Sequence, residues 1–361
     1  MYQNHFSRRK YLAAVGTASL TGVAGCSGGN DKNSEEEEEF DAEWTYQTDD
    51  SVVSSPAVAD GTVYVGSNDN NVYALDAGDG TQLWSYETDG KVKSSPTVVD
   101  STVYVGSFDG NVYALDAAEG TKQWSYGTDG KVFSSPAVAD GIVYVGSYDN
   151  NVYALDAASG TRRWSYTTDG WVISSPAVVD GIVFIGSRDN TVYALGAASG
   201  IEYWSYDTGG EVQSSPTVVD GTVYFGSLDT YIYALDANDG TKQWTQEMFD
   251  KVASSPTVVD GTVYVGDNRM RYGSVNALDV DDGSESWAFT TSDAVTSKPA
   301  VGDSIVYVTS FDSYIYALDA DDGTKQWQFE TGGPLVSSPA VVDDTIYFGS
   351  KDNKVYALPE Q

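Results

Sequence analysis

A repeat of about 40 residues is the feature that most constrains what this chain can fold into. Ser-Ser-Pro, or Ser-Lys-Pro in one copy, recurs with a spacing of 40 residues, which widens once to 43. A fixed period of this length indicates one supersecondary unit repeated along the chain. The repeated prolines are Pro56, Pro96, Pro136, Pro176, Pro216, Pro256, Pro299 and Pro339.

Each unit divides into four short segments with the composition of β-strands. Over residues 94–128 they read SSPTVVD, TVYVGS, NVYALDA and TKQWSYGT, and short turns separate them. Val, Tyr and Thr favour strands, and helical periodicity is absent. Four short strands repeated every 40 residues are typical of propeller blades. The eight units therefore predict an all-β fold over residues 44–361, an eight-bladed β-propeller with four antiparallel strands per blade.

The two ends of the repeat region complement each other. The region opens with a lone fourth strand at residues 44–48 and ends with three strands, the last at residues 354–358. We therefore expect the N-terminal strand to complete the last blade, which closes the ring and hides its edges. Because proline cannot donate to a ladder, the first strand of each unit is expected at the inner edge of its blade.

Tryptophan recurs in step with the repeat, and only Trp171 is out of phase. The periodic residues are predicted to dock adjacent blades, each burying on the order of 200 Å². The glycine after each third strand, as at Gly80, Gly120 and Gly160, is expected to adopt a positive φ. The docking residues are Trp44, Trp84, Trp124, Trp164, Trp204, Trp244, Trp287 and Trp327.

The run Y-A-L-D-A-x-x-G-x-x-x-W, as from Tyr113 to Trp124, resembles the PQQ-type propeller repeat. That repeat is found in quinoprotein alcohol dehydrogenases and in the outer-membrane assembly lipoprotein BamB. The resemblance covers residues 44–358 and implies an eight-bladed ring. It is specific for architecture and weak for function, because one fold hosts many functions.

The net charge of −34, from 19 basic and 53 acidic residues, excludes nucleic acid as a partner, because the chain would repel phosphates. The acids are spread through every repeat. We interpret this as adaptation to concentrated salt, where the Debye length falls to about 3 Å at 1 M; solubility alone is the simpler alternative. Salt adaptation predicts a melting temperature that falls as salt is removed.

Residues 1–25 have the pattern of an export signal. Arg8 and Arg9 stand in the run SRRKYL, which resembles a twin-arginine signal, and a short, mildly apolar stretch follows at residues 13–25. The run VAGC ending at Cys26 resembles a lipobox. We expect export by the twin-arginine route and lipidation of Cys26, which would anchor the protein to the outer face of the cytoplasmic membrane. A plain signal peptide with an incidental cysteine is the alternative.

Residues 26–43 hold the lipidated cysteine and an acidic, polar segment, which is predicted to be a disordered tether. Cys26 and His5 are the chain's single cysteine and single histidine. Both lie before the repeats. The propeller therefore offers no thiol nucleophile, no imidazole base and no Cys or His metal ligand.

In a propeller, the connections from strand four to strand one and from strand two to strand three open on one face, here called the variable face. Its positions differ between units, whereas the opposite turns are nearly constant. Basic residues are frequent on it, and Lys298 is expected there too. Trp171 is the leading contact candidate. The predicted ligand or partner residues are Trp171, Lys91, Lys93, Lys131, Phe133, Phe108, Tyr148, Arg188, Lys251, Arg269, Arg271, Tyr272, Phe311 and Lys351.

An aspartate also recurs on this face once in nearly every unit, as at Asp69, Asp109 and Asp149. Pairs such as Asp69 and Asn71 could bind Ca²⁺. Repetition in nearly every blade favours a structural role, because Asp readily caps its own turn.

These observations leave three functions open. The first is a non-catalytic, monomeric binding or scaffold module for protein partners or an anionic ligand, with no catalytic residue, metal or cofactor. The second follows from the resemblance: a PQQ-dependent dehydrogenase, or a PQQ or sugar binder, with Ca²⁺ on carboxylate and amide ligands, an Asp base and a stacking Trp such as Trp171. The adjacent cysteine pair and long insertions of those enzymes are missing. The third is a hydrolase with paired carboxylates, although no acidic pair stands out from the repeats.

Overall fold

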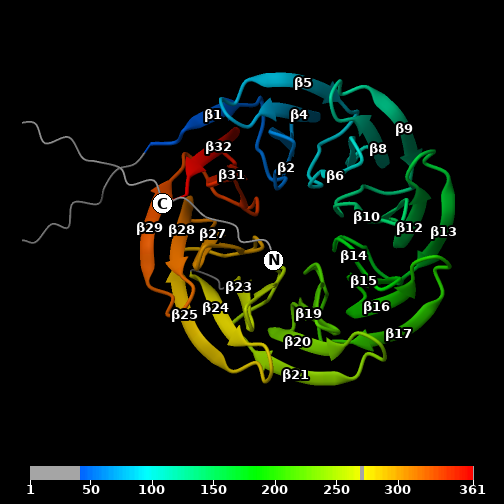
Figure 1. Ribbon diagram of the computed structural model, residues 1–361. Helices are drawn as coiled ribbons and strands as arrows, with labels where there is room; N and C mark the ends of the chain where they lie inside the picture. The colour runs from blue at the N-terminus through cyan, green and yellow to red at the C-terminus, as the bar shows by residue number, and fades with distance from the viewer. Residues whose placement is uncertain (1–40, 269–271, 361) are drawn as a thin grey trace, which may run out of the picture. The chain divides into compact units, whose positions relative to one another are not determined.

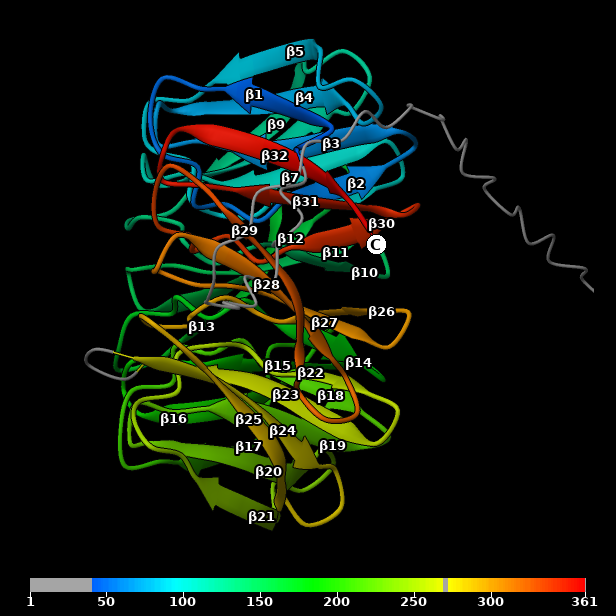
Figure 2. The ribbon, with the colours of Figure 1, turned by 90° about the vertical axis from the view of Figure 1, so that its left-hand side faces the viewer.

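The computed structural model describes residues 41–268 and 272–360. Eight four-stranded antiparallel sheets stand around a ring, which Figure 1 shows from one end and Figure 2 from the side. The predicted eight-bladed β-propeller is confirmed. The predictions for five residues lie outside the described part of the chain, namely those for Arg8, Arg9, Cys26, Arg269 and Arg271.

The strands occupy four equivalent positions in the blades. The innermost are β2 (Ala57–Ala59), β6 (Thr97–Val99), β10 (Ala137–Ala139), β14 (Ala177–Val179), β18 (Thr217–Val219), β22 (Thr257–Val259), β26 (Ala300–Gly302) and β30 (Ala340–Val342). The second are β3 (Thr62–Gly66), β7 (Thr102–Gly106), β11 (Ile142–Gly146), β15 (Ile182–Gly186), β19 (Thr222–Gly226), β23 (Thr262–Asp267), β27 (Ile305–Thr309) and β31 (Thr345–Gly349).

The third strands are β4 (Asn71–Asp76), β8 (Asn111–Asp116), β12 (Asn151–Asp156), β16 (Thr191–Gly196), β20 (Tyr231–Asp236), β24 (Gly273–Asp279), β28 (Tyr314–Asp319) and β32 (Lys354–Pro359). The outermost are β5 (Gln82–Glu87), β9 (Lys122–Gly127), β13 (Arg162–Thr167), β17 (Glu202–Asp207), β21 (Lys242–Glu247), β25 (Glu285–Thr291), β29 (Lys325–Glu330) and β1 (Trp44–Gln47). Blades are numbered 1 to 8 in the order of their innermost strands.

Blade 8 contains both the first and the last described strand. β1 pairs antiparallel with β32, and Trp44 lies opposite Ala357. The two strands lie side by side in Figure 1, β1 in blue and β32 in red. In every blade the strand that follows the repeated proline is the innermost, at one edge of its sheet. The proline therefore removes no ladder hydrogen bond.

The hydrophobic core lies between neighbouring blades in eight layers. In one layer Val72 and Trp84 of blade 1 pack against Val103 and Leu115 of blade 2. The second and third strands of each blade are buried on both faces, because each blade has a neighbour on either side. This explains why their sequences read as apolar runs rather than as a strict alternation.

The periodic tryptophans lie on the outermost strands and join each blade to the next. Trp84 Nε1 donates to the carbonyl oxygen of Ala117 at 2.8 Å, and its ring covers Gly120. Gly120 has φ +68, and a Cβ there would lie 2.6 Å from the Trp84 ring. The glycine is therefore required both for the turn and for the close approach of the indole. The same Nε1 hydrogen bond is made by Trp44, Trp124, Trp164, Trp204, Trp244 and Trp287.

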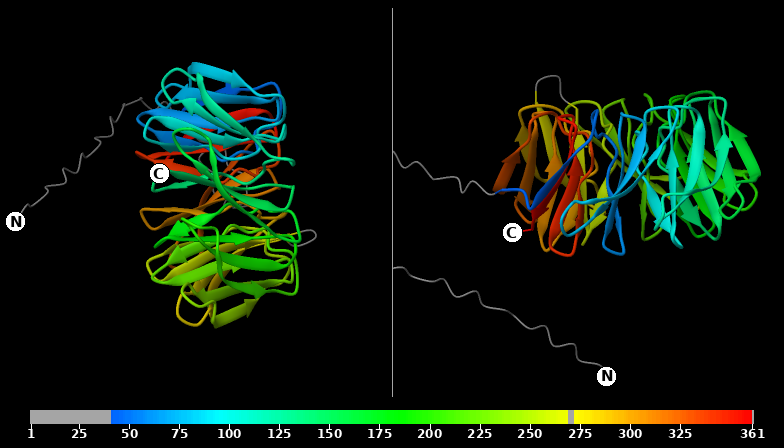
Figure 3. Two further views of the ribbon diagram at one scale, coloured as in Figure 1. Left: turned by 90° about the vertical axis from the view of Figure 1, so that its right-hand side faces the viewer. Right: turned by 90° about the horizontal axis from the view of Figure 1, so that it is seen from above.

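The described residues form strands and turns, and no helix among them is long and apolar enough to cross a membrane. Side views show the strands of each blade running between the two faces of the ring (Figure 3). The connections between blades and the turns between second and third strands meet on one of these faces, where backbone hydrogen bonds join them.

Candidate functional site

Backbone hydrogen bonds hold the connections of the variable face in place. Within blade 3, the Tyr148 amide donates to the carbonyl oxygen of Lys131 at 2.9 Å, and within blade 4 the Arg188 amide donates to that of Trp171 at 3.0 Å. These bonds join the segment before the innermost strand to the turn between the second and third strands. The side chains on both segments therefore project from a fixed backbone.

The repeated aspartate adds a link between blades. Asp149 Oδ1 accepts from the Asn151 amide at 3.0 Å, which caps its own turn. Its Oδ2 accepts from the Tyr153 hydroxyl at 2.8 Å and from the Asp129 amide at 2.9 Å, in the connection between β9 and β10. This geometry accounts for the repetition of the residue. The Tyr hydrogen bond recurs at Asp69, Asp109, Asp189, Asp229, Asp312 and Asp352.

Seven of the predicted residues form one continuous cluster across blades 2 to 4, here called the basic aromatic arc. Its members are Lys93, Phe108, Lys131, Phe133, Tyr148, Trp171 and Arg188. Each turn residue of one blade contacts the segment that opens the next blade. The sequence predicted the positions singly, and the structure brings them together.

Phe108 is the hub of the first half of the arc. The ammonium groups of Lys93 and Lys131 lie 5.0 and 5.1 Å from its ring centroid. The rings of Phe133 and Tyr148 also contact the Phe108 ring, and their centroids lie 6.1 and 6.0 Å from its centroid. Cations over an aromatic face are attracted by the ring quadrupole, by about 0.5–2 kcal/mol each. The two lysines are therefore held at the aromatic cluster, and neither forms an ion pair with a carboxylate within residues 41–268 and 272–360.

Trp171 and Tyr148 form the second half. Their rings stack at a centroid distance of 4.7 Å and an angle of 14°, and the Arg188 guanidinium lies 5.1 Å from the Trp171 centroid. Trp171 is 45% exposed, whereas the docking tryptophan Trp124 is 8% exposed. The out-of-phase tryptophan is thus a surface aromatic on a preformed stack.

Positive charge accumulates near the start of the arc. Burial lowers the pKa of Lys93, and the neighbouring charges of Lys91, Lys351 and Lys131 lower it further. Three ammonium groups from blades 2, 3 and 8 therefore act on that of Lys93. A group of like charges in a chain of net charge −34 favours an anionic ligand at this place.

An acidic side chain pairs with a basic residue at each end of the arc. Arg188 Nε lies 2.8 Å from Glu211 Oε2, an ion pair in which the N–H is not aligned with the oxygen. Gln213 donates to the same oxygen at 2.7 Å. At the other end, Lys91 pairs with Asp50 at 3.1 Å. Sequence reasoning missed both acids, because nothing distinguishes them from the many other carboxylates of the chain.

The remaining predicted residues lie outside the arc. Lys351 lies over the Phe311 ring at 4.4 Å, which joins blades 7 and 8 on the same face. Lys251 is exposed, and Tyr272, which is 54% exposed, directly precedes β24. Lys298 departs from expectation. Its side chain does not project on the variable face but extends inside the ring toward Thr217 of blade 5.

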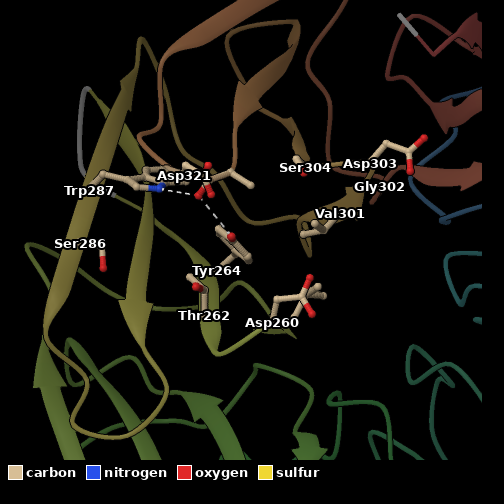
Figure 4. Close-up of a pocket in the computed structure, with 12 residues that line it drawn as sticks. Asp260, Thr262, Tyr264, Ser286, Trp287, Val301, Gly302, Asp303, Ser304 and Asp321 are labelled. Carbon is tan, nitrogen blue, oxygen red and sulfur yellow. Dashed lines mark hydrogen bonds between the residues drawn. The ribbon is translucent and has the colours of Figure 1, made fainter.

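The opposite face carries a cavity of about 480 Å³ between blades 6 and 7. Figure 4 shows Asp260, Asp303 and Asp321 around it, with Tyr264 and Trp287 at its floor. Equivalent grooves lie between blades 5 and 6 and between blades 4 and 5, lined by the matching residues. The groove is thus a product of the repeat rather than a distinct site.

The chain matches a PQQ-type family model described as outer membrane protein assembly factor BamB. The overlapping matches cover residues 41–99, 89–177, 128–230, 168–267 and 228–361, which together span the whole propeller. The chain belongs to this family. The resemblance drawn from the repeat is therefore confirmed. No curated protein matches this member of the BamB family in sequence.

Solved structures share the fold at low identity. BamB from Moraxella catarrhalis has a TM-score of 0.77 and 20% identity, over 87% of this chain and 97% of that chain. The computationally designed Ika8 protein has a TM-score of 0.79 and 20% identity, over 88% and 99%. Quinohemoprotein alcohol dehydrogenase ADHIIG from Pseudomonas putida HK5 has a TM-score of 0.74 and 17% identity, over 88% and 75%. An assembly factor, a designed protein and an enzyme thus share this architecture.

The quinoprotein resemblance implies PQQ with Ca²⁺, and the residues of this BamB-family propeller do not fit that group. The repeated carboxylates already accept several hydrogen bonds from backbone and Tyr donors, as at Asp149. Within residues 41–268 and 272–360, no group of three or more Asp, Glu, His or Cys side chains is placed to hold a metal ion.

Proposed function

We propose that this BamB-family propeller is a non-catalytic binding module that presents the basic aromatic arc to an acidic segment of a protein partner. The observation that carries the proposal is the arc itself. It joins three cations and four aromatic rings across blades 2 to 4, on a backbone that hydrogen bonds hold in place.

The chemistry of the arc favours a protein partner. Trp, Tyr, Phe and Arg are enriched in the buried centre of protein interfaces, and Trp, Tyr and Arg dominate their energetic hot spots. A partner carboxylate could pair with Lys93, Lys131 or Arg188, while an adjacent apolar side chain packs on the half-exposed rings. Such short-range contacts persist in concentrated salt, which screens charges beyond a few ångströms. The name of the family, an assembly factor, also supports a partner-binding role.

Peptide selection tests this proposal. Random peptides displayed on phage would be selected on the purified full chain and counter-selected on a variant that carries both Trp171→Ala and Arg188→Ala. We expect the selected peptides to be rich in Asp, Glu and aromatic residues. Their affinity should fall about 30-fold on Trp171→Ala alone, because a hot-spot contact contributes about 2 kcal/mol.

The control variant is Tyr203→Ala. Tyr203 is an exposed aromatic, 57% exposed, but it lies on the outermost strand of blade 4, away from the arc. It should leave affinity unchanged. Selected peptides without acidic enrichment, or with equal affinity for wild type and for Trp171→Ala, would count against the arc as the binding surface.

We also propose that the protein is exported by the twin-arginine route and is held at the outer face of the cytoplasmic membrane by lipidated Cys26. The runs around Arg8, Arg9 and Cys26 support this proposal. In the native host, Cys26→Ser should release the mature protein into the medium, and replacing both arginines with lysine should block export. Membrane retention of Cys26→Ser would contradict the lipid anchor.

A further inference from the structure

A ring of serine hydroxyls surrounds the axis of the propeller. In seven of the eight blades, the amide of the residue before the repeated proline donates to the hydroxyl oxygen of the equivalent serine in the next blade, always at 2.9 Å. The bonds run from Ser55 to Ser95, Ser95 to Ser135, Ser135 to Ser175, Ser175 to Ser215, Ser215 to Ser255, Lys298 to Ser338 and Ser338 to Ser55. Because they pass from blade to blade around the ring, these bonds encircle its axis.

The hydroxyl hydrogens of this ring are unused within the part of the chain that the structure describes. Each of the seven oxygens accepts a backbone N–H, and none donates to an acceptor among the described residues. The serines are half-buried next to the innermost strands. The inside of the ring therefore presents a set of O–H donors.

Lys298 replaces the serine of blade 7 and is the one break in this ring. Its Nζ lies 3.4 Å from Oγ1 of Thr217, in the innermost strand of blade 5. Thr217 belongs to a blade two positions away, so the side chain crosses the interior of the ring past blade 6. The Thr217 hydroxyl itself donates to the carbonyl oxygen of Pro256 at 2.6 Å.

The ammonium of Lys298 has no acidic partner among the described residues. The ion pairs there involve Lys91, Arg163 and Arg188 instead. The Lys298 side chain is exposed to solvent inside the ring, and partial desolvation by the surrounding blades lowers its pKa. An ammonium group without an acidic neighbour attracts anions from solvent. In a chain with 53 acidic residues, the lack of a carboxylate beside this cation leaves room for an anion from outside.

We propose that the interior of the ring beside Lys298 binds a small monoanion, a halide ion or a carboxylate group, held by the Lys298 ammonium and by serine hydroxyls of the ring. The seven hydroxyls and the ammonium are all donors, so the site is complementary to an acceptor with negative charge. Lys298 supplies the positive charge, and the serine hydroxyls supply further hydrogen-bond donors.

Bromide NMR tests the site directly. The line width of bromide would be measured with the purified full chain, with Lys298→Ser and with Lys298→Arg, in a background of potassium sulfate, whose anion is a dianion rather than a halide or a carboxylate. Lys298→Ser installs the residue that the other seven blades carry, so it should fold normally. We expect the excess line width of the wild type to fall at least about fivefold in Lys298→Ser and to persist in Lys298→Arg, which keeps the charge.

The matched control is Lys251→Ser, which removes an exposed lysine of blade 6 and should leave the line width unchanged. Added acetate should displace bromide if the site accepts carboxylates, whereas displacement by chloride alone would restrict it to halides; either result supports a monoanion site. An excess line width that is equal in wild type and Lys298→Ser would overturn the proposal.

Thermal stability gives a second readout. At constant potassium, Lys298→Ser should melt higher than the wild type in sulfate, because the variant installs the serine that forms the ring in the other seven blades. Replacing sulfate with bromide should narrow that difference, because bromide stabilises only the chain that binds it. The same difference in melting temperature in both salts would show that no anion binds at Lys298.

Discussion

Raising the pH above about 10 is expected to unfold the propeller within roughly one to two pH units. Six tyrosines of the third strands are buried, and each donates its hydroxyl to the repeated aspartate of its own turn. They are Tyr73, Tyr113, Tyr153, Tyr233, Tyr316 and Tyr356. Burial raises the pKa of each hydroxyl, and the hydrogen bond to the aspartate raises it further.

The sign of the effect follows from proton binding. Above about pH 10 these tyrosines lose their protons in the unfolded chain but keep them in the folded protein. The folded state then binds more protons, so the free energy of unfolding falls as the pH rises. Each tyrosine contributes about 1.4 kcal/mol per pH unit, and six contribute roughly 8 kcal/mol per pH unit. That slope is comparable to the whole stability of a typical domain.

Two spectroscopic signals would be followed during the titration, tyrosinate absorbance and the circular dichroism of the β-sheets. We expect the buried tyrosines to ionise only as the sheet signal is lost. Tyr153→Phe should lower by one the number of protons released on unfolding at high pH. It also removes the hydrogen bond to Asp149. Full tyrosinate absorbance while the sheet signal remains intact would show that these hydroxyls ionise in the folded protein.

Replacing a docking tryptophan is expected to cost far more stability than replacing Trp171. Trp124→Ala removes a buried indole between blades 2 and 3 and leaves a cavity, so we expect a loss of about 3–5 kcal/mol. It also removes the hydrogen bond of 2.8 Å that Trp124 Nε1 donates to the carbonyl oxygen of Ala157. Trp171→Ala removes a stacked ring on the surface and should cost less than about 1.5 kcal/mol.

Denaturant unfolding at constant molar salt would measure the difference. Trp124→Phe serves as a graded control, because it keeps an aromatic ring but lacks the Nε1 donor, and it should fall between the wild type and Trp124→Ala. If Trp171→Ala destabilised the protein as much as Trp124→Ala, Trp171 would belong to the packed structure, and its loss could not be interpreted as the loss of a contact residue.

Sequence alone predicted the fold because every blade repeats the same local rules. Pro136 marks an innermost strand and Trp124 marks a blade junction, and each has seven counterparts that agree; Gly160 marks a turn with positive φ and has six. The arc was harder to predict. Its residues were found as departures from the repeat, but only the blade-to-blade geometry shows that Phe108 meets Lys131 and that Tyr148 meets Trp171.

Lys298 shows where the repeat misleads. The Ser-Lys-Pro copy lies close in sequence to residues of the variable face, and its charge resembles theirs. Its direction depends on the inward position of the residue before each proline, which is visible only once the serine ring is seen. Glu211 was missed for another reason: the ion pair with Arg188 joins blades 4 and 5, and no sequence signal singles out one carboxylate among so many.

Site-specific photo-crosslinking in the native host tests the central claim most directly. A photoreactive amino acid would replace Phe133 in the basic aromatic arc, Tyr203 on the outer strand of blade 4, or Ser286 beside the opposite-face cavity. We expect a discrete protein adduct from position 133, attached through an acidic segment of the partner and lost when Trp171→Ala is added. An adduct that forms equally from positions 203 or 286, or that survives Trp171→Ala, would contradict the arc as the partner-binding surface.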